Sequence, residues 1–191
     1  MNPYRERIWA QFEKIMPPLD PQMPVLDFGS GDGWFASQML GSGVTDNLTA
    51  FDIKLRPHVL HDPIIYDGGS LPVPDRSFEL SYSVDVMHHC PDPVWQIEDV
   101  LRCTNRYFLL KDHTYRTRLG QLELCLLDEI GNRKFGIPSL YQYQRRWSWF
   151  KVIEKQGFVL RKLVYPAPCH VGVLGALTNP LQFIGLWERV G

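Results

Sequence analysis

The sequence predicts an α/β fold in which a mostly parallel sheet lies between two layers of helices. Short apolar segments are expected to form strands at 24–28, 48–52, 64–66, 78–84 and 106–111. Segments with helical apolar spacing separate most of these strands, and this alternation is typical of a parallel sheet covered on both faces. The segment 24–28 also leads into a glycine-rich turn that a helix follows, which is how open sheets of this class present a ligand-binding loop.

The same spacing rules place the remaining elements. Residues 3–16 carry Tyr4, Ile8, Phe12 and Ile15 at helical spacing, and prolines then form a linker into the first strand. Further helices are expected at 33–40, 92–103, 122–130 and 139–156, and further strands at 158–165 and 181–189, with a long loop at 172–180. We therefore expect a single domain over residues 1–191, with an N-terminal helix and linker at 1–22.

Composition limits the partners and the compartment. The 191 residues carry a net charge of −1, so no general attraction to nucleic acid or to acidic membranes is expected. The N-terminus is too polar for a signal peptide, and no apolar run is long enough to span a bilayer. The four cysteines are widely spaced without a Cys-x-x-Cys pair. This usage suits a reduced, cytoplasmic protein; the oligomeric state is left open.

Residues 25–33, Val-Leu-Asp-Phe-Gly-Ser-Gly-Asp-Gly, are the most informative segment. Alternating glycines permit positive φ and leave backbone N–H groups open to a ligand, and the helix that follows points its positive end to the same place. The dinucleotide fingerprint would need glycine at position 34, which is Trp34. A pyrophosphate has no use for the carboxylate of Asp27, whereas a cofactor with an ammonium group does. A nicotinamide-dependent oxidoreductase is therefore disfavoured.

The segment resembles the first motif of the class I S-adenosylmethionine-dependent methyltransferases, an acid followed by three alternating glycines. Residues 67–79, with Leu-Pro-Val-Pro-Asp-Arg-Ser-Phe-Glu, and the later pair His88-His89 resemble the quinone-biosynthesis type of this domain. The resemblance covers residues 25–110. It implies a Rossmann-like, three-layer α/β fold with a seven-stranded sheet that is parallel except for one strand. It also implies that the cofactor is S-adenosylmethionine, released as S-adenosylhomocysteine.

Two departures from the resembled family stand out. The usual Lys-Pro-Gly-Gly before the fifth strand is replaced by Arg102-Cys103-Thr104-Asn105, and the N-terminal extension that often caps the active site is short. The first departure matters little for cofactor binding. The second leaves open which segment covers the active site, and therefore how large the methyl acceptor is.

The resemblance also assigns cofactor-binding residues. The loop that wraps the amino-acid end of the cofactor would comprise Asp27, Phe28, Gly29, Ser30, Gly31 and Gly33. Asp52 ends the second strand, where a carboxylate accepts hydrogen bonds from both ribose hydroxyls, and Ile53 would lie against the adenine. Asp67 and Gly68 would bind the adenine edge, and Ser83 lies at the same end of the sheet. The alternatives are a solvent-exposed strand-ending acid at Asp52 and an ordinary turn residue at Asp67.

Three histidines are candidates for the catalytic base. Methyl transfer from a sulfonium needs in-line positioning and, for O–H, N–H or C–H acceptors, a group that takes the proton. His113 follows the fifth strand beside Asp112, which can fix its tautomer, and His88 and His89 follow the fourth. Packing or helix capping explains at least one of the adjacent pair. No metal site is expected, because none of the three has ligand partners at usable spacing in the sequence.

The methyl acceptor is the least determined part of the prediction. Residues 112–157 are expected to be a substrate or lid insertion. Within them, 141–151 interleaves aromatic residues with arginine, which suits a buried helix face, base stacking, a membrane interface or an acceptor pocket. We expect a methyltransferase for a small-molecule acceptor. The alternatives are a methyltransferase for protein or RNA and a non-catalytic S-adenosylmethionine-binding partner protein.

Overall fold

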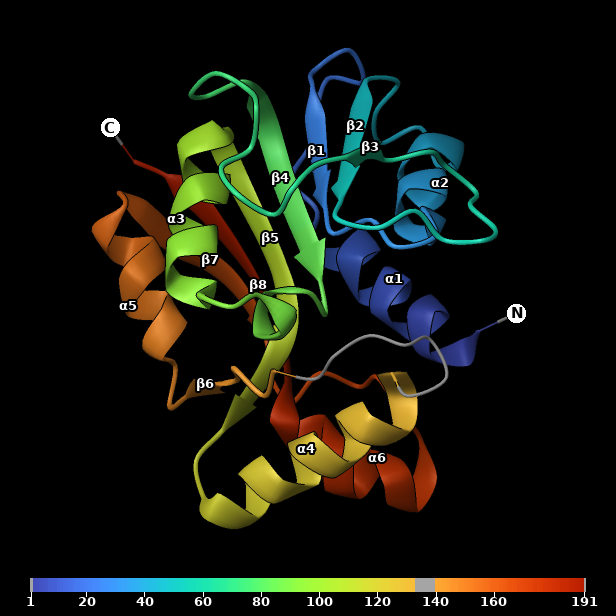
Figure 1. Cartoon of the computed structure of the whole chain (residues 1–191), viewed down its shortest axis with the longest axis vertical. Coiled ribbons are helices and arrows are strands. Elements are labelled where there is room, and N and C mark those ends of the chain that lie inside the picture. Colours follow the sequence, from blue (N-terminus) through green and yellow to red (C-terminus); the bar gives the residue numbers. More distant parts are fainter. Residues whose placement is uncertain (1, 133–139, 191) are drawn as a thin grey trace.

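The computed structural model describes residues 2–132 and 140–190 and confirms the predicted α/β fold (Figure 1). Within these residues, seven strands lie side by side in the order β3-β2-β1-β4-β5-β8-β7. Their bounds are β1 Val25–Phe28, β2 Leu48–Asp52, β3 Ile64–Ile65, β4 Phe78–Val84, β5 Thr104–Tyr115, β7 Phe158–Val164 and β8 Gln182–Arg189. Only β8 among them is antiparallel to its neighbours, β5 and β7. A short strand, β6 (Gln144–Arg145), pairs with the end of β5.

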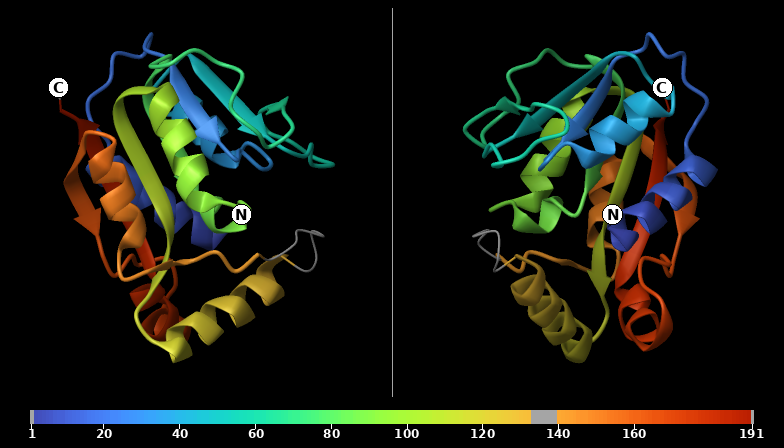
Figure 2. Two further views of the ribbon diagram at one scale, coloured as in Figure 1. Left: turned by 60° about the vertical axis from the view of Figure 1, so that its left-hand side comes forward. Right: turned by 90° about the vertical axis from the view of Figure 1, so that its right-hand side faces the viewer.

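Helices cover both faces of the sheet (Figure 2). On one face lie α3 (Pro93–Cys103) and α5 (Ser148–Lys155), and on the other lie α1 (Pro3–Ile15) and α2 (Trp34–Gly41). Alternate residues of β5 join the two cores: Phe108 and Leu110 pack with α3 and α5, and Tyr107 and Leu109 with α1 and α2. Among the described residues, no helix has the length and apolar composition needed to cross a membrane.

The order of the strands creates one switch point. The chain passes from β1 to β2 on one side of β1 and later places β4 on the other side, so β1 is paired with both. The connection that leaves β1 runs toward β2, and the connection that leaves β4 runs the other way, toward β5. The two diverge at the carboxyl ends of these neighbouring strands and open a crevice, which is where ligands bind in open α/β sheets.

Two expected elements are wrong. The helix predicted at 139–156 is present only as α5, because Gln144 and Arg145 pair with the end of β5 and positive φ values at Arg146 and Trp147 break the chain direction. Residue 139 lies outside the described residues. The loop predicted at 172–180 is instead the helix α6 (Gly172–Thr178), followed by a 3-10 turn at Asn179–Leu181.

Two further elements are longer than expected. The strand predicted at 106–111 extends over 104–115, and the helix predicted at 122–130 is α4 (Arg118–Asn132). The extra residues of β5 carry the chain beyond the sheet edge, and α4 then lies at the lower end of the molecule in Figure 1.

Candidate active site

Gly29, Gly31 and Gly33, which follow β1, all have positive φ, but their surroundings differ. A Cβ on Gly29 would lie 2.4 Å from the methyl groups of Val86, and one on Gly33 would lie 2.5 Å from the carbonyl oxygen of His61. Gly31 has nothing within 4 Å of that position. Gly29 and Gly33 therefore allow close packing within the protein, whereas Gly31 leaves open space.

That open space belongs to a cavity of about 910 Å³ at the carboxyl ends of β1, β2 and β4, called the large cavity below. Nine of the eleven predicted cofactor residues line it: Asp27, Phe28, Gly29, Ser30, Gly31, Asp52, Ile53, Asp67 and Gly68. The structure does not bring the other two to it. Gly33 lies behind the loop as the N-cap of α2, and Ser83 is fully buried within β4.

Asp27 is the most unusual group of the large cavity. It is 3% exposed, and burial raises the pKa of its carboxyl to about 7 although the hydroxyl groups of Tyr82 and Ser30 lower it. The charged groups that act on it most, Asp52 and Asp32, are acidic and raise the pKa further. The folded protein thus disfavours the ionised carboxylate until a cation is brought beside it.

Asp52 shapes the loop from the neighbouring strand. Its Oδ2 accepts a hydrogen bond of 2.7 Å from the backbone N–H of Gly31, and its Oδ1 accepts one of 3.0 Å from Lys54 N–H. A carboxylate offers about four lone-pair positions, so each oxygen keeps room for a ligand hydroxyl. Next to it Ile53 is 65% exposed, an apolar side chain presented to the cavity.

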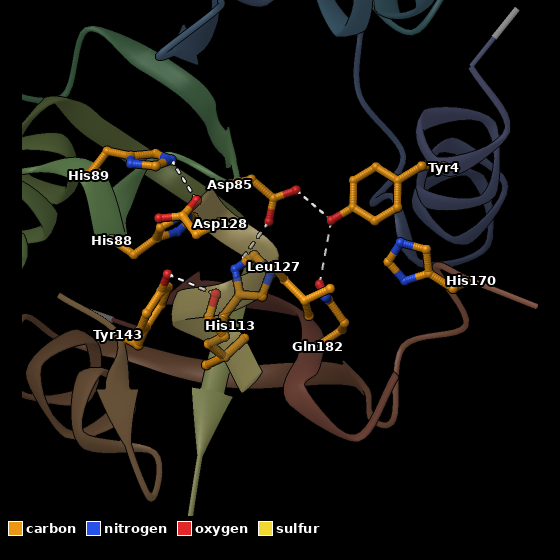
Figure 3. Close-up of a pocket in the computed structure, with 11 residues that line it drawn as sticks. Tyr4, Asp85, His88, His89, His113, Leu127, Asp128, Tyr143, His170 and Gln182 are labelled. Carbon is orange, nitrogen blue, oxygen red and sulfur yellow. Dashed lines mark hydrogen bonds and ion pairs between the residues drawn. The ribbon is translucent and has the colours of Figure 1, made fainter. Parts of the chain in front are cut away.

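A second cavity of about 280 Å³, called the small cavity below (Figure 3), shares part of its lining with the large one. Three residues line both: Tyr4 of α1, Asp85 after β4 and His89. The remaining lining residues come from several elements: His88, His113, Leu124, Leu127, Asp128, Tyr143, His170 and Gln182. The three histidines predicted to be catalytic therefore meet here.

Lys111 organises the boundary between the cavities. Its side chain is fully buried and donates hydrogen bonds to Asp85, to the Tyr4 hydroxyl and, at 2.6 Å, to Gln182 Oε1. Burial alone would raise the pKa of Asp85, but the Lys111 ammonium outweighs it and the pKa is lowered. Asp85 also adopts a positive φ of 56°, a strained conformation that surrounding structure must hold in place.

The histidine cluster is held by Asp112, which is fully buried. Its Oδ1 accepts the His88 Nδ1–H at 2.7 Å and the backbone N–H of His113 at 2.7 Å. Its Oδ2 accepts the backbone N–H of Met87 at 3.1 Å. Asp112 thereby fixes the ring of His88 and the backbone on both sides of the cluster.

The three imidazoles differ in charge. Burial lowers the pKa of His88, but the carboxylates of Asp112 and Asp128 outweigh it and raise the pKa to about 10. Burial and the neighbouring His88 lower the pKa of His89 to about 4, and burial with Lys111 lowers that of His113. At neutral pH, His88 is cationic while His89 and His113 are neutral.

Several lining residues were not singled out from the sequence. Tyr4 was assigned only to the apolar face of α1, and Asp128 only to a helix. Gln182 and Tyr143 lie in segments that the chain brings back from far along the sequence. Tyr4 carried a local signal, a hydroxyl at the start of an otherwise apolar helix face, and Tyr143 lies in the aromatic segment 141–151, for which an acceptor pocket was one of the expected roles.

A comparison with protein families shows which family this chain belongs to. Residues 1–162 match the family described as a methyltransferase domain. The chain belongs to this methyltransferase family. Together with the strand order, this confirms the resemblance to class I methyltransferases that residues 25–110 carry.

Solved structures share this methyltransferase fold at low sequence identity. An S-adenosylmethionine-dependent methyltransferase from Mesorhizobium loti has a TM-score of 0.70 at 14% identity, covering 96% of this chain and 98% of that chain. A protein from Bacillus halodurans, proposed to be a methyltransferase, has a TM-score of 0.69 at 15% identity, covering 95% and 98%. A Haloferax volcanii protein, solved with the methyltransferase activator Trm112, has a TM-score of 0.68 at 12% identity, covering 98% and 91%. No match was found among proteins of curated function.

Replacing Asp27 by Asn tests the electrostatic state of the large cavity. With a pKa of about 7 in the folded protein and a usual value of 3.8, Asp27 lowers the free energy of unfolding as the pH rises from about 4 to about 7. The amide does not titrate. The stability of Asp27→Asn relative to the unaltered protein should therefore grow by about 2–3 kcal/mol between pH 5 and pH 8.

Thermal or urea unfolding of the ligand-free protein at the two pH values measures this difference. Asp62→Asn, at an exposed acid, is the control and should show no such growth. A stability gain for Asp27→Asn that is equal at pH 5 and pH 8 would contradict the prediction.

Proposed function

We propose that this methyltransferase binds S-adenosylmethionine in the large cavity and transfers its methyl group to a small polar acceptor in the small cavity. The observation that carries the proposal is the shared wall of Tyr4, Asp85 and His89, which places the two cavities side by side. A donor and an acceptor held on either side of this wall can meet without crossing solvent.

The groups of the large cavity suit this cofactor. Its ammonium would supply the positive charge that buried Asp27 lacks, and its ribose hydroxyls suit the remaining lone pairs of Asp52. Ile53 offers an apolar surface to the adenine, with Asp67 and Gly68 near its edge. When bound, the cofactor supplies a methyl group that its sulfonium already activates, so the protein contributes position and proton handling.

The size and lining of the small cavity favour a small acceptor. About 280 Å³ accommodates a compact molecule, and the polar lining suits one with hydroxyl or amine groups. Two parts of the proposed substrate insertion, α4 and Tyr143, line it, whereas α5 of the same insertion packs on the sheet. A protein or RNA acceptor would have to insert a single side chain or base into this cavity. That alternative is retained because the similar Haloferax protein was solved with a protein activator of methyltransferases.

Among the three histidines, we assign the proton-accepting role to His113. His88 is cationic and its Nδ1–H is engaged by Asp112, so it is not a base at neutral pH. His113 is neutral, and its Nδ1 lies 3.4 Å from Asp112 Oδ1 and 3.5 Å from Asp85 Oδ1. These carboxylates favour the tautomer with a proton on Nδ1, leave Nε2 as acceptor, and stabilise the imidazolium that forms.

Gly31→Val tests the cofactor assignment. The valine side chain would project into the large cavity, and its φ of 64° is strained for a β-branched residue. Gly172→Val is a matched control, because Gly172 has a φ of 59°, equally open surroundings and no part in either cavity. Both variants should lose about 1–3 kcal/mol of stability.

Only Gly31→Val should lose binding of S-adenosylmethionine, by at least about tenfold in calorimetric titration, a change of about 1.4 kcal/mol. Equal affinity in the two variants, or no binding by the unaltered protein, would overturn the cofactor assignment.

The acceptor class is tested with a cofactor labelled in its methyl group. The protein is incubated with a cell extract separated into small molecules, protein and RNA. Label should enter the small-molecule fraction, because the small cavity admits only compact groups. Gly31→Val provides the background. Label in protein or RNA would establish the macromolecular alternative, and no label in any fraction would favour a non-catalytic binding protein.

With an acceptor in hand, His113→Ala tests the base. Turnover should fall by about 10²–10⁴ while the affinity for the cofactor is unchanged, because loss of a general base acts on the transition state. Added imidazole should restore part of the rate in His113→Ala and leave the unaltered protein unaffected. Full activity in His113→Ala together with loss in His89→Ala would assign the role to His89 instead.

A further inference from the structure

Contrary to the expectation from sequence spacing, we propose that the small cavity contains a binding site for one divalent transition-metal ion, formed by His88 Nε2, His89 Nε2 and the carboxylate of Asp128. The site itself stands on geometry alone, and only its catalytic role rests on the proposed methyl transfer. The ligands come from two elements, the 3-10 helix at Met87–His89 and α4. Figure 3 shows the side chains of His88, His89 and Asp128 next to one another.

The distances suit an ion after a small contraction. Asp128 Oδ1 lies 3.7 Å from His88 Nε2 and 3.7 Å from His89 Nε2, and all three ligand atoms lie within 4.8 Å of one another. Bonds of about 2.1 Å at angles of 90–110° would place such atoms about 3.0–3.4 Å apart. A small movement of α4 would bring Asp128 to both imidazoles, and rotation of the His88 and His89 rings would bring their nitrogens to the ion.

Asp112 supplies the support that metal-binding histidines usually have. By accepting the His88 Nδ1–H at 2.7 Å, it leaves Nε2 to face Asp128 and the cavity. A carboxylate behind the ligating imidazole fixes its tautomer and raises its basicity.

A second group, His88 with Asp112 and His113, also has ligand atoms within 4.8 Å, but it is the poorer choice. Both oxygens of Asp112 already accept hydrogen bonds, from the His88 ring and from backbone N–H groups, and the residue is fully buried. Asp112 would have to give up these bonds to ligate an ion, and it does not line the cavity. Asp128 does line it, and would exchange its contacts with His88 and Tyr143 for the ion.

The ligand set indicates the kind of ion and its use. Two imidazoles and one carboxylate suit Zn²⁺, Fe²⁺, Co²⁺ or Mn²⁺ better than Ca²⁺ or Mg²⁺, which prefer oxygen ligands. Three protein ligands leave positions for an acceptor oxygen, whose O–H the ion would acidify. The proton would pass to His113, the oxygen would take the methyl group, and the electron pair of the broken S–CH₃ bond would stay on sulfur as a neutral thioether.

Titration of the metal-stripped full chain with Co²⁺, followed by visible absorption, tests the site without any turnover. We expect one equivalent to bind and Zn²⁺ to displace it. His89→Gln and Asp128→Asn should each weaken binding at least about tenfold, and Asp112→Asn by about 10–100-fold through the orientation of His88. His170→Gln is the control, because it lines the same cavity outside the cluster. Circular dichroism of each variant confirms folding.

Absence of a cobalt band, or equal losses in His170→Gln and His89→Gln, would overturn the proposal. A loss in His113→Gln without one in Asp128→Asn would overturn it in favour of the second group. Calorimetric titration of the same proteins with S-adenosylmethionine is independent of the ion. It therefore separates failure of the metal site from failure of the proposed function.

Discussion

Both cavities depend on the hydrogen bonds that the fully buried Lys111 ammonium donates. An unpaired charge at this depth would cost several kcal/mol, so its hydrogen-bond partners must all be in place. They are Asp85 after β4, Tyr4 on α1 and Gln182 on β8. Because Tyr4 and Asp85 line both cavities, the packing that satisfies Lys111 also builds the wall between them.

The two sides of that wall are electrostatically opposite. In the small cavity, Asp85 and Asp128 lie beside basic partners, as does Asp112 behind His88, and the pKa values of all three carboxyl groups are lowered. In the large cavity, Asp27 is buried with acidic neighbours and its pKa is raised. The ionised form of Asp27 is therefore unfavourable until a cation arrives. This arrangement favours a cationic methyl donor in the large cavity.

Much of the large cavity could be predicted because its residues follow one another in short motifs. The segment from Asp27 to Gly31 and the acid at Asp52 carry local signals of strand, turn and charge. The small cavity could be predicted only in part: its three predicted histidines follow β4 and β5 directly, but their partner Asp128 has no local signal. Asp128 lies on α4 and approaches His88 only because β5 runs on past the sheet edge before α4 begins. The helix expected at 139–156 was wrong for a related reason, since pairing of Gln144 with β5 outweighs helical spacing there.

The N-terminal helix α1 contributes residues to both cavities in addition to covering the sheet. A resemblance confined to residues 25–110 treats the first helix as a short extension, yet Tyr4 hydrogen-bonds Asp85 at 2.8 Å and its ring lies 4.9 Å from that of His170. Arg5 also pairs with Asp32 of the glycine loop at 2.7 Å. These contacts join α1 to the loop, to the end of β4 and to the chain before α6. Docking of α1 thus completes both cavities together, which explains how a short N-terminal segment can close a site built for two ligands.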